Sequence, residues 1–354
     1  MPRVKPVIVG VVGATGMVGR ELVTLLERRR FPVKTLRPFS SGRGLASVRF
    51  RGQRLAAPAI SKSSLSSCDL VFLVSSDDVA LKYGPLLASQ GVWTIDDSAA
   101  FRLGKDTPLI IPEVNASSLR RENRLIAGPN CTMTGLAVAG ALLHRSIGIR
   151  EVRLASYQSV SGAGKDALAE LFSQYSSLSG LTLTKDGRAP VLDSGRAFAL
   201  PRAIAYNAVP HVGRFDAHGI SSEEAKVAAE LRKIWSAPRL KISVTTVRVP
   251  TIRGHALAAW LTLDKALSLS KTRELLRRTP GLVLSSQGDY PTPRSCGGRD
   301  PVFAGRLRPG ATDNEIALWI VSDNLLKGAA LNSLQIAEEL IRRGWLTARA
   351  TTPS

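Results

Sequence analysis

The sequence predicts an α/β protein: a Rossmann-type, doubly wound parallel sheet, followed by an α+β domain with a mainly antiparallel sheet. The chain has 354 residues, which is enough for two domains with cores of their own. A strand near the N-terminus runs into a glycine-rich turn and an amphipathic helix, the order of a dinucleotide-binding fold. Further strands alternate with helices in the first part of the chain, which indicates a parallel sheet.

The first element is a predicted strand over residues 6–12 (PVIVGVV), rich in β-branched residues. The turn after it reads Gly13-Ala-Thr-Gly16-Met-Val-Gly19, and a helix is predicted over 20–29. Glycines here let backbone N–H groups approach a pyrophosphate, whose charge the helix N-terminus favours. The other predicted elements of this sheet are strands over 33–36, 69–75, 92–95, 109–111 and 125–126 and a helix over 79–89.

The segment RPFSSGRG, residues 37–44, bears on the choice of cofactor. Chains of this type that bind NAD place a carboxylate about 20 residues after the glycines, where it holds the ribose 2′-OH. Here no Asp or Glu occurs between Glu27 and Asp69. The segment is either an ordinary polar loop or a cradle for a 2′-phosphate, and we expect the cradle, and therefore NADP. Its candidate contacts are Arg37, Ser40, Ser41 and Arg43.

The second half of the chain predicts the α+β domain. A strand over 152–158 leads into a glycine- and serine-rich turn, and a long irregular stretch covers 182–212. Two strands flank a tight turn near residue 254. The remaining predicted elements are strands over 242–249, 256–263 and 314–321 and helices over 166–178, 222–235 and 329–343.

The last predicted helix carries apolar residues on one face, which suits packing back on the first domain. We therefore divide the chain into an NADP-binding domain over 1–130, a catalytic and dimerisation domain over 131–325, and a C-terminal segment over 326–354.

The charge balance bears on partners. Lys and Arg number 48 against 28 Asp and Glu, a net charge of +20, which admits nucleic-acid binding. However, the cations are spread along the chain, and aromatic residues make up only 5%, too few for stacking platforms. We expect a solvated basic surface, with some cations serving an anionic substrate and cofactor, and neither a nucleic-acid nor a membrane partner.

The cysteines and the N-terminus bear on location. Three scattered cysteines cannot build a disulfide framework and indicate a reducing cytoplasm. The basic and apolar N-terminus is interrupted by glycines and lacks a convincing cleavage site, so we expect no targeting signal.

Cys131, in LIAGPNCTMT, is the candidate nucleophile. An apolar helix is predicted to start at Thr132 or shortly after, and a thiol at a helix N-terminus gains from the dipole that stabilises its thiolate. A free cysteine is equally often a small core residue, so the local sequence leaves both interpretations open.

A cysteine nucleophile needs a proton-handling partner. Of the four histidines, His255 sits at the tip of a turn in RVPTIRGHA, where it is either a satisfied polar residue or a base. Arg248 and Arg253 make an anion site conceivable nearby. Cysteine, histidine and a bound nicotinamide together suggest thioester chemistry with hydride transfer.

Eight segments carry a resemblance over essentially the whole chain. They are VVGATGMVGREL, TIDDSAAFR, PLIIPEVN, LIAGPNCTMT, SYQSVSGAGK, YNAVPHV, VRVPTIRGHA and SDNLLKGAALNSLQIAE. In this order and spacing the sequence resembles the aspartate-β-semialdehyde dehydrogenases. The resemblance implies an enzyme that reduces L-4-aspartyl phosphate reversibly with NADPH to the semialdehyde, in lysine, threonine and methionine biosynthesis, and at least a homodimer, or a homotetramer.

The resemblance also implies residue roles. Cys131 would form the thioester, His255 would be the general acid/base, and Gln158 would position the substrate. The substrate contacts it implies are Arg248 for the α-carboxylate, Glu223 for the α-amino group, and Arg102, Asn130 and Lys226 for the phosphate. The cofactor contacts are Gly13, Thr15, Gly16, Met17, Val18, Ser40, Ser41, Arg43, Ser161, Gly162, Gly164 and Asn324. No metal site is implied.

The chain departs from the family pattern at a few positions. Phe39 stands where an arginine is common before the serine-glycine loop, and Leu326 where the family often has arginine. Asp97 and Ala99 replace a common Asn and Ser. The nearest rival is N-acetyl-γ-glutamyl-phosphate reductase, with the same chemistry on a different acyl phosphate. A non-catalytic relative is disfavoured because both Cys131 and His255 are present.

Overall fold

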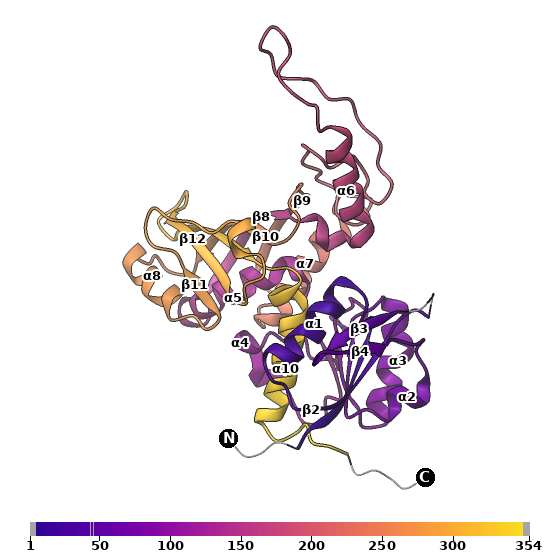
Figure 1. Cartoon of the computed structure of the whole chain (residues 1–354). Coiled ribbons are helices and arrows are strands. Elements are labelled where there is room, and N and C mark those ends of the chain that lie inside the picture. The colour runs from indigo at the N-terminus through magenta and orange to yellow at the C-terminus, as the bar shows by residue number, and fades with distance from the viewer. Residues whose placement is uncertain (1–4, 43, 45, 350–354) are drawn as a thin grey trace.

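The computed structural model describes residues 5–42, 44 and 46–349, which form two lobes and a protruding arm (Figure 1). The first lobe holds a five-stranded sheet in the order β2-β1-β5-β6-β7, with every pair parallel. Its strands are β1 (Val7–Val12), β2 (Val33–Phe39), β5 (Leu70–Leu73), β6 (Trp93–Asp96) and β7 (Leu125–Ala127). The predicted Rossmann-type sheet is confirmed.

Strand β1 is buried on both faces because helices cover both sides of the sheet. Val9 and Val11 join a core with α1 and the C-terminal helix, whereas Val12 joins a second core with α3. The helices of this lobe are α1 (Met17–Arg28), α2 (Lys62–Ser66), α3 (Asp77–Ser89) and α4 (Pro112–Asn115), with a 3-10 turn η1 (Ala116–Ser118).

Three expectations for this lobe need correction. Residues 109–111 are not a strand: Leu109 forms one isolated bridge to Ala127, after which Pro112 starts helix α4. Strand β2 extends to Phe39, so the first three of the eight residues in segment 37–44 are strand. A separate hairpin of β3 (Ser47–Phe50) and β4 (Gln53–Ala56) was not predicted.

The second lobe holds a six-stranded mixed sheet in the order β11-β12-β13-β10-β8-β9. The three central pairs are antiparallel and the two outer pairs are parallel, so the mainly antiparallel sheet is confirmed. Its strands are β8 (Ile149–Gln158), β9 (Lys241–Arg248), β10 (His255–Leu263), β11 (Leu282–Leu284), β12 (Val302–Pro309) and β13 (Glu315–Ser322). Strands β11 and β12 were not predicted.

Strands β9 and β10 follow each other in sequence but do not pair. Both flank β8, antiparallel to β10 and parallel to β9, so the segment between them crosses the end of β8. That crossing brings the start of β10 to the turn that follows β8. The helices of this lobe are α5 (Cys131–Ile147), α6 (Lys165–Ser177), α7 (Ser222–Ile234), α8 (Leu269–Arg277) and α9 (Pro293–Cys296), with a 3-10 turn η2 (Val160–Ala163).

The chain returns to the first lobe after β13. A π-helical turn η3 (Leu326–Ala330) continues into helix α10 (Leu331–Arg342), which lies beside α1 (Figure 1). Apolar side chains of α10, among them Leu334 and Leu340, are fully buried in the core that α1 also lines.

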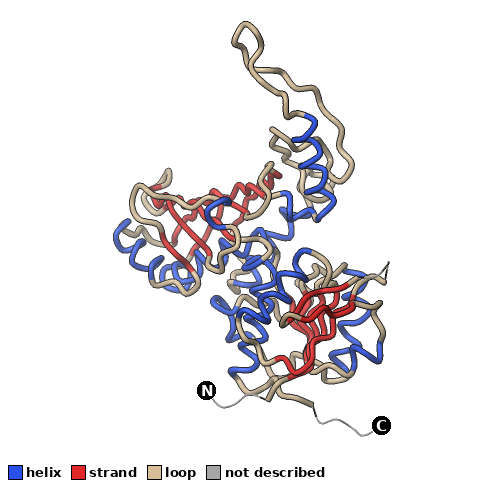
Figure 2. Tube along the Cα trace, in the orientation of Figure 1, coloured by secondary structure: helices blue, strands red, loops and turns tan. Residues whose placement is uncertain are grey.

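The arm follows α6 and projects away from both lobes, as an extended loop (Figure 2). It covers the predicted irregular stretch and carries large apolar side chains in water, including Val191 at 97% and Phe198 at 86% exposure. Across the part of the chain that the structure describes, no helix combines the length and apolar character needed to cross a bilayer.

Candidate active site

Cys131 is the first residue of α5, directly after the loop that leaves β7. Asn130 caps the helix, and its side-chain oxygen accepts a hydrogen bond from Thr132 N at 2.6 Å. The helix therefore starts one residue earlier than predicted, and the cysteine lies within its first turn. The Sγ atom of Cys131 lies 3.5 Å from Nε2 of His255.

His255 is the first residue of β10 and only 1% exposed. Gly254 before it has φ +89°, a conformation that suits glycine, and its absent side chain lets Pro293 approach. On the far side of the ring, the backbone N–H of Ser159 donates to Nδ1 at 3.1 Å. The turn after β8 thus holds the ring from behind while Nε2 faces the thiol.

The protonation of this pair differs from the sequence-based expectation. Burial, with the nearby Glu223 carboxylate, raises the pKa of the Cys131 thiol to about 11, although Arg102 and Arg248 act to lower it. Burial and the charge of Arg248 lower the pKa of His255 to about 3. The expected lowering of the thiol pKa at the helix start is wrong, because the loss of hydration on burial outweighs the effect of the helix.

Glu223, on the first turn of α7, accepts hydrogen bonds from several of the residues that were predicted to bind the substrate. Its Oε1 accepts hydrogen bonds from Thr132 Oγ1 at 2.8 Å, Asn130 Nδ2 at 3.1 Å and Gln158 Nε2 at 3.5 Å. Gln158 ends β8 and is 1% exposed. The structure therefore brings these sequence-predicted residues together around one carboxylate, beside the thiol.

Of the three cationic side chains predicted to bind the substrate, two have partners among the described residues and one does not. Arg248, at the end of β9, is buried and donates from one terminal nitrogen to Ser159 O at 2.7 Å. Arg102 donates to the backbone oxygen of Asp97 at 2.7 Å and pairs with Glu230 at 3.2 Å. Lys226, one turn after Glu223, makes no hydrogen bond or ion pair within the described residues.

Glu230 was not singled out from the sequence. It is 1% exposed on α7, accepts from the backbone N–H of Asn130 at 2.6 Å, and pairs with Arg102. One carboxylate therefore holds both the residue before the thiol and a predicted phosphate ligand. Its position two turns after Glu223 on one helix face was the available signal.

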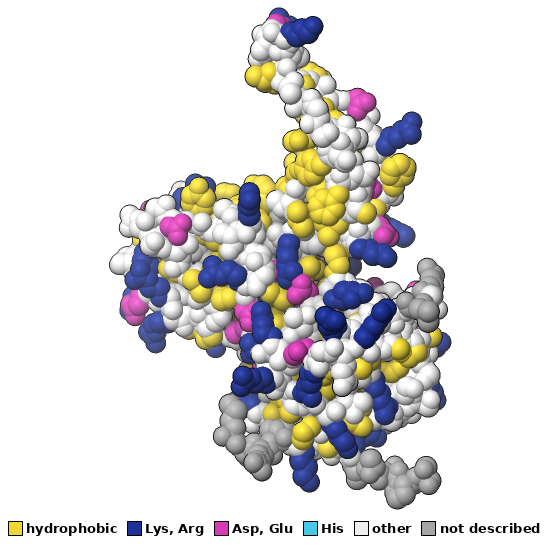
Figure 3. All heavy atoms as spheres, in the orientation of Figure 1, with side chains coloured by type: hydrophobic (Ala, Val, Ile, Leu, Met, Phe, Trp, Pro, Cys, Tyr) yellow, Lys and Arg dark blue, Asp and Glu magenta, His cyan; other side chains and the backbone are white. Residues whose placement is uncertain are grey.

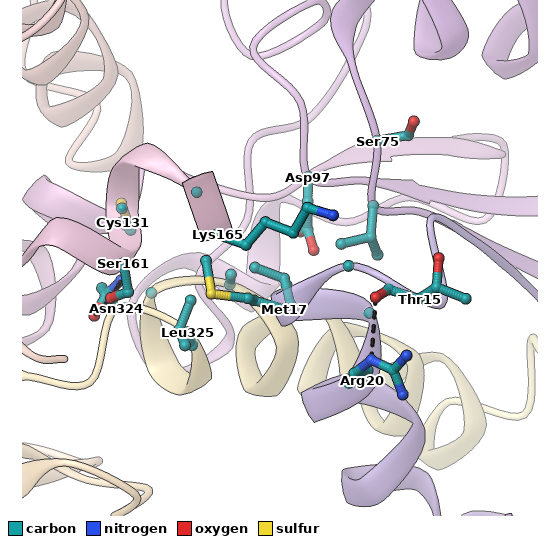
Figure 4. Close-up of a pocket in the computed structure, with 18 of the residues that line it drawn as sticks. Thr15, Met17, Arg20, Ser75, Asp97, Cys131, Ser161, Lys165, Asn324 and Leu325 are labelled. Carbon is teal, nitrogen blue, oxygen red and sulfur yellow. Dashed lines mark hydrogen bonds between the residues drawn. The ribbon is translucent and has the colours of Figure 1, made fainter. Parts of the chain in front are cut away.

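A cleft of about 810 Å³ leads from the thiol to the glycine turn (Figure 4). Cys131, Ser161 and Asn324 lie at one end, Thr15 and Arg20 at the other, and Asp97 lies between them. Its other lining residues include Gly16, Met17, Val18, Gly19, Ser75, Gly162, Gly164, Lys165 and Leu325. This volume lies within the range of clefts that bind small molecules and cofactors.

The glycine turn fits a dinucleotide. Gly13 has φ +78°, and a Cβ there would meet the backbone oxygen of Val74 at 2.0 Å. A Cβ on Gly19 would meet the Gly13 oxygen at 2.1 Å, so both positions demand glycine. Gly16 caps α1 without a side-chain hydrogen bond, which leaves the first N–H groups of the helix directed at the cleft.

The residues expected to contact a 2′-phosphate differ in whether their side chains are free to bind it. Ser40 is buried, and its hydroxyl donates to Ala57 O at 2.7 Å, whereas Ser41 is exposed. Arg37 donates to Ser64 O at 3.0 Å, so it is engaged with α2. Arg43 lies outside the described residues.

The sequence analysis missed several cleft residues, among them Arg20, Lys165 and Gly328. Arg20 donates to Thr15 O at 3.1 Å at the glycine end, and Lys165 extends across the cleft (Figure 4). Gly328 in η3 lies against the nucleophile, because a Cβ there would meet the Cβ of Cys131 at 2.8 Å. Lys165 and Gly328 belong to the segments SYQSVSGAGK and SDNLLKGAALNSLQIAE, which already carried the resemblance.

Comparison with known proteins gives matches over nearly the whole chain. Residues 8–122 match the family described as semialdehyde dehydrogenase, NAD binding domain, and residues 140–327 match semialdehyde dehydrogenase, dimerisation domain. The chain is 36% identical to an aspartate-semialdehyde dehydrogenase of Bacillus subtilis, over 94% of this chain and 96% of that protein. It is 37% identical to that of Legionella pneumophila, over 94% and 95%.

Solved structures agree with these sequences. The crystal structure of aspartate semialdehyde dehydrogenase II from Vibrio cholerae matches with a TM-score of 0.89 and 33% identity, covering 96% of this chain and 99% of that one. The same Vibrio cholerae enzyme has also been solved in complex with ASA, and it matches equally well.

Proposed function

The chain belongs to the aspartate-semialdehyde dehydrogenase family, and from this premise we propose how its own residues carry out the reaction. The enzyme reduces L-4-aspartyl phosphate to L-aspartate 4-semialdehyde and releases phosphate, a reversible step of amino-acid biosynthesis toward lysine, threonine and methionine. The observation that carries the proposal is the thiol of Cys131 facing His255 at 3.5 Å, at the end of the cleft opposite the glycine turn.

Cys131 is the proposed nucleophile. Its sulfur attacks the acyl carbon of the substrate and the C–S bond forms while the thiol proton passes to the departing phosphate. The C–O bond to phosphate breaks, and phosphate leaves with the electron pair. A nicotinamide cofactor held in the cleft by the glycine turn, Ser161 and Asn324 would supply the hydride that reduces the resulting thioester. The reduced adduct collapses to the aldehyde and returns the electron pair to sulfur. His255 is the proposed acid/base partner at these atoms.

The remaining groups bind the substrate. The ammonium of the substrate pairs with Glu223, its α-carboxylate pairs with Arg248, and Gln158 holds the acyl group near the thiol. Arg102, Asn130 and Lys226 are the proposed phosphate ligands. Pairing of the ammonium with Glu223 also neutralises the carboxylate charge that, with burial, raises the pKa of the Cys131 thiol, so substrate binding helps to activate the nucleophile.

NADP is the proposed cofactor. The support is the absence of any carboxylate between Glu27 and Asp69 that would hold a ribose 2′-OH. Because Ser40 and Arg37 have other partners, Ser41 and Arg43 are the proposed contacts of the 2′-phosphate, with Arg20 beside the pyrophosphate. The cofactor contacts at the glycine turn, at Ser161, Gly162 and Gly164 and at Asn324 all belong to cleft-lining segments.

We also propose that the enzyme is a cytoplasmic homodimer, or a tetramer built from such dimers. The proposed division is an NADP-binding domain over 1–130, a catalytic and dimerisation domain over 131–325, and a C-terminal segment over 326–354. The arm exposes large apolar side chains, which Figure 3 shows along its surface. Contact with a second copy of the chain would remove them from water, and this supports the dimer. All three cysteines are free, which fits a reducing compartment.

A purified-enzyme assay tests the function. With phosphate and NADP, the enzyme should oxidise aspartate semialdehyde, and replacing NADP with NAD should lower kcat/KM. The comparisons do not favour N-acetyl-γ-glutamyl-phosphate reductase, because the relatives found are aspartate-semialdehyde dehydrogenases. Activity confined to N-acetylglutamate semialdehyde would overturn the proposal.

A further inference from the structure

Behind His255 lies a buried polar cluster of Ser159, Ser161 and Asn324. None of the three side chains is more than 4% exposed. The Ser159 hydroxyl lies 3.1 Å from His255 Nδ1, 3.1 Å from Ser161 Oγ and 3.1 Å from Asn324 Oδ1. Asn324 Oδ1 also accepts from the backbone N–H of Gly254 at 2.9 Å. The cluster thus ties the turn after β8 to the turn before β10.

This cluster decides which ring nitrogen carries the proton. A backbone N–H can only donate, and that of Ser159 points at Nδ1 from 3.1 Å. Nδ1 is therefore an acceptor, so the neutral ring carries its proton on Nε2, facing Cys131 Sγ. The Ser159 hydroxyl donates to Asn324 Oδ1 at 3.1 Å, which anchors this residue and keeps its backbone N–H directed at Nδ1. Arg248 also holds the backbone of Ser159 in place, because its guanidinium donates to Ser159 O at 2.7 Å.

We propose that Ser159, with Asn324 behind it, is a positioning residue that holds His255 as the Nε2–H tautomer, so that the ring meets the reacting atoms as a hydrogen-bond donor. This inference rests on the proposed function and refines the acid/base role of His255 in it. Ser159 itself is 0% exposed and does not line the cleft, so it acts only through the ring.

The donor role fits the reductive half of the reaction. When hydride adds to the thioester carbon, the carbonyl oxygen takes the π-electron pair, and Nε2–H donates to that oxygen. When the adduct collapses, the electron pair on oxygen re-forms the C=O bond and the C–S bond breaks. Sulfur then leaves as a thiolate, which faces the same Nε2–H. No proton has to leave the ring in either step, so the low basicity of His255 is no obstacle.

Nitrogen-15 NMR of the intact free enzyme tests the tautomer directly. A His255→Asn variant identifies the His255 signals among the four histidines. At neutral pH, Nδ1 should resonate as an unprotonated nitrogen and Nε2 as an N–H. The reverse pattern, or a protonated ring, would overturn the proposal. This measurement needs no substrate, so its outcome is independent of whether the proposed function holds.

Ser159→Ala tests the catalytic consequence. Loss of the hydroxyl should lower kcat about five- to tenfold, the worth of one hydrogen bond. The affinity for NADPH, followed by fluorescence, should change less than kcat, because Ser159 contacts Ser161 and Asn324 but does not itself line the cleft. Ser159→Thr should recover much of the lost kcat. An unchanged kcat in Ser159→Ala, or a loss explained by weaker NADPH binding, contradicts the proposal. If the alanine variant does not fold, the NMR measurement still decides.

Discussion

The thiol of Cys131 and the imidazole of His255 meet at 3.5 Å although 124 residues separate them in the chain. The contact joins the start of α5 to the start of β10. It forms because the strand order places β10 beside β8, whose last residues lie behind the imidazole ring. Each partner is neutral near pH 7, since the pKa of the thiol is raised to about 11 and that of the ring is lowered to about 3.

Replacing the nucleophile should abolish turnover and leave the fold intact. We expect Cys131→Ser to lose activity with aspartate semialdehyde, phosphate and NADP by at least about 10³-fold, because a serine hydroxyl in this buried site is far harder to ionise. Circular dichroism and thermal unfolding should match the parent. Cys296→Ser is the matched control, since that thiol is also buried but is not among the residues that line the cleft. Turnover near the parent value in Cys131→Ser would refute the assignment.

Glu223→Gln should separate thiol reactivity from catalysis. Glu223 raises the pKa of the Cys131 thiol, so removing its charge should speed alkylation of Cys131 by iodoacetamide at neutral pH. The same change should raise KM for the semialdehyde, because the ammonium loses its partner. Mass spectrometry of the labelled peptide gives the first rate and steady-state assays the second. Slower alkylation in the variant would show that Glu223 does not act on the thiol as described.

Glu230 should be a large contributor to stability. It is a buried carboxylate that holds both Asn130 N and Arg102, and removing one partner of a buried ion pair leaves the other uncompensated. We expect Glu230→Ala to lower the free energy of unfolding by about 3–5 kcal/mol in urea titrations. Glu274→Ala, which removes an exposed carboxylate paired with Lys271, should change stability little. Equal effects of the two variants would contradict this ranking.

Asp97 should make stability depend on pH. Burial raises its pKa to about 6, while Ser333 Oγ donates to its Oδ1, and Oδ2 is buried with no partner among the described residues. An acid whose folded-state pKa is raised stabilises the fold while protonated, and that stability is lost as the pH rises from about 4 to about 6. The loss is at most about 3 kcal/mol, from roughly two pH units.

The matching variant is Asp97→Asn, which carries the residue common in the family at this position. As the pH rises from 4 to 7, the unfolding free energy of the parent should fall relative to that of the variant. Denaturant titrations at several pH values measure it. A difference independent of pH would mean that Asp97 titrates normally in the fold.

The arm should carry part of the dimer interface. We expect the double variant Val191→Asp with Phe198→Asp to weaken or abolish the dimer. Both apolar side chains are more than four-fifths exposed in the single chain, so burial in an interface is what would stabilise them. Light scattering coupled to gel filtration measures the assembly. Leu103→Asp, at a 55% exposed position in the first lobe, is the control and should not change the assembly. A parent chain that is monomeric, or a dimer unaffected by the arm substitutions, would contradict the proposal.

The sequence predicted the first lobe well because its signals are local. A buried strand, three glycines and an amphipathic helix within about 25 residues define a dinucleotide site by backbone conformation alone. The strands missed in the second lobe, β11 and β12, are short or irregular in their polarity, and the strand predicted over 109–111 failed because its backbone makes a single bridge before Pro112. Strand order was beyond reach, since pairing partners are set by contacts far apart in the chain.

By itself, the sequence determined the fold class, the place of the glycine turn, and the candidate set that includes Cys131, His255 and Glu223. Only the tertiary structure decided how these groups behave. It set the contact between thiol and imidazole, tied Arg102 to Glu230, and aimed the Ser159 N–H at the ring. It also reversed the expected thiol pKa, because the balance between a helix start, nearby charges and lost hydration depends on which residues the fold packs around the sulfur and how much water it excludes.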